Sequence, residues 1–180
     1  LQVAIKSGHL DIADLLIDRG ADLNFIEEPT ELNPFCQPVI QTAGGRAVFD
    51  CRRMIKRWKG QYEMHSSKEK ADQSFKVFEK MLELGADISQ KNSHGGTLLQ
   101  TILIETKEVL PSYSWKTKET RDNVLITEEL RHDLNRIYNL LIRYGVTSDE
   151  ISAYYKIPLK ELYQDSPTME FLNRLDQSRS

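Results

Sequence analysis

Apolar side chains recur at helical spacing along the first 24 residues of the chain. Between His9 and Arg19 they occupy one face of a 3.6-residue period: Leu10, Ile12, Ala13, Leu16 and Ile17. The pattern predicts a helix here, after a shorter helix over residues 1–6 and a turn at Ser7–Gly8. We expect Gly20 to end the second helix, because glycine readily takes the positive φ that follows a last helical turn.

The same arrangement returns twice farther along the chain. Gly85 and Gly145 each close a helical pattern whose apolar residues match those of the first: Phe75, Val77, Phe78, Met81 and Leu82 before one glycine, and Ile137, Tyr138, Leu141 and Ile142 before the other. An aliphatic residue followed by glutamine marks each preceding helix: Leu1–Gln2, Ile40–Gln41 and Leu99–Gln100. Phe78 and Tyr138 stand in the position of Ala13, and we expect both in the core between the repeats.

The second and third repeats are longer than the first. From the aliphatic residue to the closing glycine, the distance is 19 residues in the first repeat, 45 in the second and 46 in the third. The excess of 26 and 27 residues falls at the same place, between the two helices of each repeat. Because simple stacking of repeats does not require such insertions, they predict a second surface along one edge.

Helical spacing continues through the first insertion. Val48, Cys51, Ile55 and Trp58 follow intervals of 3, 4 and 3 residues, and Ala71, Phe75, Phe78 and Leu82 follow intervals of 4, 3 and 4. Both are patterns of packed antiparallel helices. They predict an overlong helical hairpin, with residues 39–58 against residues 67–84 and with Ser66 and Glu69 as a capping box.

The third repeat gives a similar prediction for its second helix. Leu130, Leu134, Ile137, Tyr138 and Leu141 form one apolar stripe. Thr127, followed by two glutamates, predicts the start of that helix. Residues 111–122 are polar and are interpreted as a loop.

The first repeat resembles the ankyrin repeat. The segment GHLDIADLLIDRGADLN, Gly8 to Asn24, follows that family's second helix and the start of its hairpin almost position by position. The family's TPLHxA signature is cut off at the start of the chain, with Gln2 where the family usually has histidine, and we interpret the chain as a fragment that opens inside a helix. HGGTLLQ, His94 to Gln100, is similar to the hairpin turn that runs into this signature.

Periodicity and resemblance together predict an all-α fold. We expect an ankyrin-repeat solenoid of about three repeats over 1–146 (1–36, 37–96 and 97–146), two of them with extended helical hairpins. Residues 147–180 are predicted to form a C-terminal helical cap, since the end of a solenoid needs a polar outer face. Thr147 and Glu150 predict one cap helix to Tyr155, and Ser166–Pro167 predicts another whose inward side chains are Met169, Leu172 and Leu175.

The sequence contains no enzyme motif. Phosphate-binding glycine patterns, the HExxH metal motif and the GxSxG nucleophile motif are all missing, and the four histidines are scattered. A nucleophilic pair of histidine with Cys36 or Cys51 stays open as an alternative to the use of these cysteines as small apolar residues. We interpret Gly44–Gly45 as relaxing a helix. The prediction is therefore a protein without catalytic residues, cofactor or metal site.

Composition favours an intracellular protein. No apolar run approaches the roughly 20 residues that span a bilayer, and no signal peptide is visible at the start. Two cysteines in 180 residues indicate a reducing compartment, and we expect the cytoplasm. The long insertions are similar to those of divergent ankyrin proteins that intracellular bacteria deliver into host cells, which would place the chain in the host cytoplasm.

A local excess of positive charge interrupts an acidic chain. Residues 44–70 carry +5, against a net charge of −3 for the whole chain. The cations that form the predicted basic patch are Arg46, Arg52, Arg53, Lys56, Arg57 and Lys59. They predict a surface for an acidic partner, an anionic lipid or a nucleic acid. The alternative is the solvated outer face of a long helix.

The first hairpin, residues 21–37, is the other candidate surface. It is acidic and has no basic residue. Ankyrin relatives bind partners with hairpin tips and with the concave helical face, so the resemblance points to this finger and to the next tip. The predicted partner-binding residues are Phe25, Ile26, Glu27, Glu28, Glu31 and His94. The alternative is a loop whose aromatic side chains cover the core.

Three functions follow from these features. The first is a protein-binding module that uses the hairpin finger and the concave helical face. The second is a segment that recruits substrates for a larger enzyme or effector. The third is anionic lipid or nucleic-acid binding through residues 44–70, which steep salt dependence would reveal.

Overall fold

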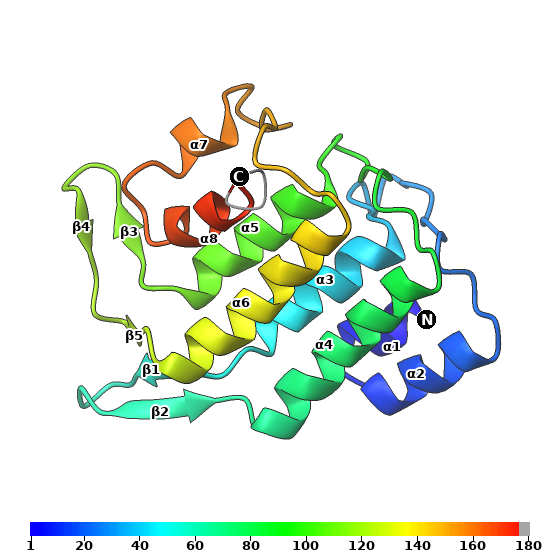
Figure 1. Ribbon diagram of the computed structural model, residues 1–180, viewed down its shortest axis with the longest axis horizontal. Helices are drawn as coiled ribbons and strands as arrows, with labels where there is room; N and C mark the ends of the chain where they lie inside the picture. Colours follow the sequence, from blue (N-terminus) through cyan, green and yellow to red (C-terminus); the bar gives the residue numbers. More distant parts are fainter. Residues whose placement is uncertain (177–180) are drawn as a thin grey trace.

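Antiparallel helix pairs stack side by side in the computed structural model, which describes residues 1–176. The pairs are α1 (Gln2–Lys6) with α2 (Leu10–Asp18), α3 (Val39–Phe49) with α4 (Lys68–Glu83), and α5 (Leu98–Val109) with α6 (Glu128–Arg143). The first helices α1, α3 and α5 pack in one layer, and α2, α4 and α6 pack in the other (Figure 1). The second helices lie where the apolar periodicity predicts them.

The ends of the helices follow local sequence signals. Gly20, Gly85 and Gly145 have φ of +80°, +87° and +75°, and a Cβ added at any of them would meet nothing within 4 Å. Glycine is therefore needed at these positions because it adopts a positive φ easily, and not because a larger side chain would clash with a neighbour. Thr127 caps α6, as predicted, by accepting the Leu130 N–H. The cap of α4 is Ser67, one residue after the predicted Ser66.

The apolar faces of both helix layers meet in one core. Phe78 and Tyr138 are fully buried, as is Ala13 at the matching position, which confirms their predicted place. The Tyr138 hydroxyl shares a hydrogen bond of 3.0 Å with Thr106. Gly44 brings α3 close to α5, because a Cβ there would lie 3.0 Å from Leu98 Cδ1.

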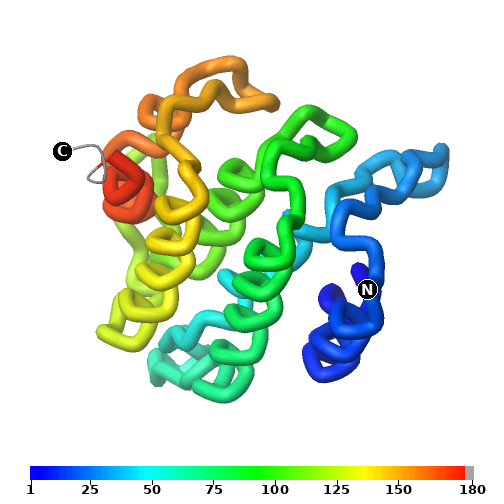
Figure 2. The backbone as a smooth tube through the Cα atoms, turned by 45° about the vertical axis from the view of Figure 1, so that its right-hand side comes forward, coloured from blue at the N-terminus to red at the C-terminus, as the bar shows by residue number. Residues whose placement is uncertain are grey.

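The glutamine of each aliphatic–Gln pair is buried and binds the loop that follows in the stack. Its side-chain Nε2 donates to a backbone carbonyl in every case: Gln2 to Gln37 at 3.0 Å, Gln41 to Gln90 and Gly96 at 3.0 Å each, and Gln100 to Ile151 at 3.1 Å. Because a buried carbonyl left unpaired is costly, these bonds hold the successive loops in register. The loops project along one edge of the stack, in blue, green and orange (Figure 2).

The insertions are β-structures, so the all-α prediction is wrong here. α3 ends at Phe49, and β1 (Arg53–Lys56) and β2 (Tyr62–His65) form a hairpin where a helix to residue 58 was predicted. The tip residue Trp58 is 98% exposed and belongs to no helical seam. The helical spacing of Val48, Cys51, Ile55 and Trp58 covers only three intervals. It is a weaker determinant of structure than the hydrogen bonding of β1 to a strand on each side.

The two insertions pair with each other. β5 (Val124–Leu125), from the second insertion, runs antiparallel to β1 and completes a three-stranded sheet of order β2-β1-β5. β3 (Tyr113–Ser114) and β4 (Glu119–Thr120) form a separate hairpin inside the predicted loop 111–122. Figure 1 shows these strands gathered along one edge of the helix stack, as the recurrent insertions predicted.

The C-terminal segment differs in part from the predicted cap. The helix predicted from Thr147 to Tyr155 does not form. Residues 147–158 are instead a loop closed by a bridge between Ile151 and Pro158. Two short helices follow this loop, α7 (Leu159–Leu162) and α8 (Met169–Arg174). Leu172 and Leu175 are buried as predicted, and α8 packs on α6. The last predicted cap residues, 177–180, lie outside the described residues. Every helix within 1–176 is too short or too polar to cross a membrane.

Candidate functional site

Three adjoining hollows lie along the exposed side of α5. Their volumes are about 270, 180 and 350 Å³. The first two share Gln37, Thr101 and Glu105, and the last two share Ile104 and Tyr154. We call this surface the α5 groove. The surface extends from residues of α1 and α3, across α5, to the β3–β4 hairpin.

Phe35 and Tyr154, the two ends of an aromatic row, line the middle hollow of the α5 groove. The His94 ring lies between Phe35, at 5.4 Å between ring centroids, and Tyr154, at 6.0 Å. The three residues come from three successive loops of the stack, more than 50 residues apart in sequence. Phe35 and Tyr154 are 42% and 44% exposed. The register of the loops therefore creates an aromatic surface that no single segment contains.

The far end of the α5 groove is built by the second insertion and the C-terminal loop. Trp115, 48% exposed, lines it from the β3–β4 hairpin and is held edge-on against Tyr113 at 4.9 Å. Tyr155 and the half-exposed Ile104 line it from the loop and from α5. Contiguous exposed apolar surface of this kind marks interaction sites on soluble proteins.

One carboxylate lies in the middle of the α5 groove. Glu105 is half-buried, and Gly45 lets it lie against α3, since a Cβ at Gly45 would come within 3.4 Å of Glu105 Cγ. Burial and the neighbouring charge of Glu108 raise the pKa of Glu105, while Arg53 acts in the opposite direction. Among the described residues, Glu105 has neither a hydrogen bond nor an ion pair through its side chain.

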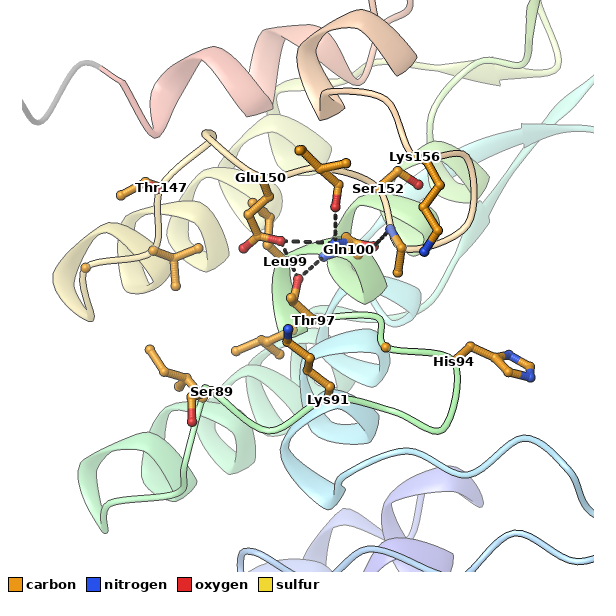
Figure 3. A pocket seen from close by; sticks show the side chains of 17 residues that line it. Ser89, Lys91, His94, Thr97, Leu99, Gln100, Thr147, Glu150, Ser152 and Lys156 are labelled. Carbon is orange, nitrogen blue, oxygen red and sulfur yellow. Dashed lines mark hydrogen bonds between the residues drawn. The ribbon is translucent and has the colours of Figure 1, made fainter.

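A larger pocket, about 740 Å³, lies between the loops at 88–97 and 145–156 (Figure 3). Its central polar groups bind one another. Thr97 Oγ1 donates to Glu150 at 2.6 Å, and Gln100 Nε2 donates to the same carboxylate at 3.2 Å. His94 points away from this cluster. Thr97, Gln100 and Glu150 thus hold the C-terminal loop onto α5.

The predicted finger residues are divided between two places. Phe25 and Glu27 line a separate hollow of about 240 Å³ beside Leu1 and Val3. Ile26, Glu28 and Glu31 are exposed on the loop. Of the predicted set only His94 reaches the aromatic row of the α5 groove, although Phe35 of the same finger does so too.

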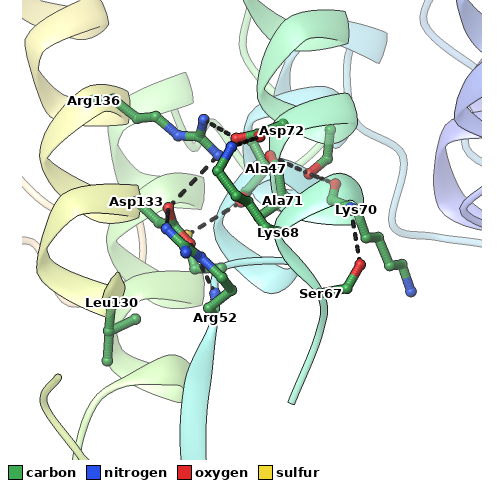
Figure 4. Close-up of polar contacts among 12 residues, drawn as sticks. Ala47, Arg52, Ser67, Lys68, Lys70, Ala71, Asp72, Leu130, Asp133 and Arg136 are labelled. Carbon is green, nitrogen blue, oxygen red and sulfur yellow. Dashed lines mark hydrogen bonds and ion pairs between the residues drawn. The ribbon is translucent and has the colours of Figure 1, made fainter. Parts of the chain in front are cut away.

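Two members of the predicted basic patch bind buried aspartates. Arg46 Nε lies 2.6 Å from Asp50, and Arg52 Nη2 lies 2.8 Å from Asp133, both carboxylates being fully buried. Figure 4 shows Arg52 and Arg136 on either side of Asp133. These guanidinium groups clamp the start of the first insertion onto the helices, so their charge is already compensated within the fold.

The other four cations of the basic patch lie on the β1–β2 hairpin. Arg53 is buried and donates to backbone carbonyls. Lys56 and Arg57 each form an exposed ion pair with a carboxylate. Lys59 is exposed at the hairpin tip beside Trp58. Of the six predicted cations, Arg46, Arg52, Lys56 and Arg57 therefore form ion pairs, Arg53 binds backbone carbonyls, and Lys59 is exposed.

Both cysteines are buried free thiols. Cys51 Sγ donates to the Ala47 carbonyl at 3.4 Å, and burial raises the pKa of this thiol far above its ordinary value. A thiol that stays protonated is a poor nucleophile. The arrangement fits the interpretation of Cys51 as a small apolar residue.

Comparison with known proteins identifies the first helix pair. The family model of the ankyrin repeat matches residues 1–27. This match covers α1, α2 and the beginning of the finger, and it supports the resemblance drawn from Gly8 to Asn24. No curated protein and no solved structure matches the chain. Ankyrin repeats are generally protein-interaction modules.

Sequence reasoning missed most of the α5 groove. Ile104, Glu105, Trp115, Tyr154 and Tyr155 were in none of the predicted sites. Two signals could have drawn attention to them: a tryptophan within a polar insertion, and adjacent tyrosines in a segment with little other apolar content. Neither signal shows that these residues share one surface.

Proposed function

We propose that this protein is a binding module that takes up a segment of a partner polypeptide in the α5 groove. The observation that supports this most is that the exposed side chains of Phe35 and Tyr154, packed on either side of His94, line the same surface as Trp115. Exposed aromatic anchors supply much of the energy of protein interfaces. The ankyrin-repeat match at 1–27 supports the same class of function.

The proposal moves the binding site predicted from sequence. The finger contributes Phe35, whereas Phe25 and Glu27 face a different hollow. The basic patch is a weaker candidate, because the guanidinium groups of Arg46 and Arg52 are committed to buried carboxylates. A partner could use those charges only by breaking the pairs, which is costly.

The experiment is a selection of peptides from a phage-displayed library of random peptides on the immobilised protein. Selected peptides are then tested for affinity to Ile104→Asp and Tyr154→Ala. Both side chains are exposed, so the variants are expected to fold, and thermal unfolding checks this. The matched controls are Phe25→Ala in the finger and Trp58→Ala on the β1–β2 hairpin.

Loss of affinity in the two groove variants, with both controls unchanged, supports the proposal. Loss only in Phe25→Ala would place binding at the N-terminal hollow and contradict it. Loss only in Trp58→Ala would favour the β1–β2 hairpin, with the same consequence.

A further inference from the structure

We infer that the segment bound in the α5 groove carries a basic side chain that pairs with Glu105, two residues from an apolar residue that packs on Ile104 and Tyr154. This inference rests on the proposed function, because it specifies the partner of the same groove. It concerns the chemistry of the ligand, which neither the ankyrin-repeat match nor the fold determines.

Among residues 1–176, Glu105 is the one carboxylate that lines two of the three hollows, and it lies where they meet. Glu108, one helical turn farther along α5, lines the third hollow. Two carboxylates on one side of a helix repel each other. A cation placed between them from outside would relieve this repulsion and would compensate a half-buried charge.

The protein's own cations do not fill this role. The charge of Arg53 lowers the pKa of Glu105, but the Arg53 guanidinium donates its hydrogen bond to the Phe49 carbonyl, at 2.7 Å. Arg46, which lines the same hollow as Glu105, is bound to Asp50. Lys6 lines that hollow as well, and Lys107 lines the third hollow beside Glu108. Neither lysine forms an ion pair with Glu105 among the described contacts. The negative charge in the middle of the groove is thus available to a ligand.

The apolar contact follows from the position of Ile104. Ile104 and Glu105 are consecutive on α5, and Ile104 joins the two hollows that also share Tyr154. One extended segment can reach both places with side chains two residues apart, because alternate side chains point to the same face and each residue advances about 3.3 Å. Arginine is the better basic residue for such a site, since its planar group binds carboxylate through two hydrogen bonds and stacks on aromatic rings.

The test uses those phage-selected peptides whose binding depends on Ile104 and Tyr154. We expect them to share a basic residue two positions from an apolar one. Replacing that residue by glutamine, or Glu105 by glutamine, should each weaken binding by about 10-fold or more. The two changes together should weaken it no further than either alone, because they remove the same interaction. Glu83→Gln is the matched control, an exposed glutamate at the end of α4.

Selection on Glu105→Lys adds an independent check. Enrichment of acidic residues in place of the basic one supports the inference. Groove-dependent peptides without a basic preference, or an additive double change, would overturn it while leaving the proposed function standing. If no selected peptide depends on Ile104 and Tyr154, the proposed function fails, and the inference fails with it.

Discussion

Gln100 holds the backbone of Ala153 through the oxygen of its side-chain amide. The Ala153 N–H donates to Gln100 Oε1 at 2.8 Å, while Gln100 Nε2 donates to the Ile151 carbonyl at 3.1 Å. Tyr154 follows directly in the chain, so the same bonds position the aromatic wall of the α5 groove. A residue of the buried helix face thereby fixes a side chain of the binding surface.

Gln100→Ala is expected to disturb this loop. It leaves a backbone N–H and a carbonyl without their partner, at a cost of about 1–3 kcal/mol per buried group. Urea unfolding measures the global cost, and hydrogen exchange of the amides at 150–156 measures local opening. Gln73→Ala, on the exposed side of α4, is the control and should change neither. Unchanged exchange in the Gln100 variant would show that the bridge between Ile151 and Pro158 suffices.

Phe78→Ala tests the alignment of the second helix pair with the first. Phe78 is fully buried where the first pair has Ala13, so its removal should leave a cavity and cost roughly 3–5 kcal/mol. Denaturant unfolding gives the free energy. Phe25→Ala is the control, since Phe25 is 48% exposed and its loss should cost far less. Equal effects would contradict the burial of Phe78.

Two arginines of the basic patch should respond differently to the same substitution. Arg52→Met leaves the buried Asp133 carboxylate poorly compensated, and we expect a loss of about 3–5 kcal/mol in unfolding free energy. Arg57→Met breaks only an exposed pair with Glu63 and should cost less than about 1 kcal/mol. Adding Asp133→Leu to Arg52→Met should recover part of the loss. Similar costs for the two arginine variants would argue against a structural role for Arg52.

Glu105→Gln should stabilise the protein at neutral pH. Burial raises the pKa of Glu105 in the folded state above its ordinary value of 4.5, so ionisation weakens the fold. That penalty is absent below the ordinary pKa and is complete once the pH has risen through the folded pKa. Unfolding at about pH 7 and about pH 3.5 should therefore show a gain for the variant only at the higher pH, with Glu83→Gln as control. A gain at both would point to packing instead of charge.

Local signals in the sequence were sufficient for the helix pairs. The closing glycines needed only a positive φ, and Gly20, Gly85 and Gly145 have it. The apolar stripes gave the buried faces of α2, α4 and α6 because helical periodicity depends on near neighbours alone. The capping of α6 by Thr127 followed for the same reason.

The insertions and the α5 groove could not be predicted in this way. β1 pairs with β5, about 70 residues away, and a pairing over that distance leaves no periodic trace in either segment. The Phe35–His94–Tyr154 row likewise depends on the register of three loops, which Gln41 and Gln100 fix from inside the stack.

The sequence by itself determined where α2, α4 and α6 lie and end, and it showed that the first pair resembles an ankyrin repeat. Only the tertiary structure decided that Arg52 serves the buried Asp133 and that Glu105 is left facing a groove. The physical reason is range: backbone conformation and amphipathicity are set by residues a few positions apart. Ion-pair partners and exposed surfaces are set by whichever segments the packed helices bring together.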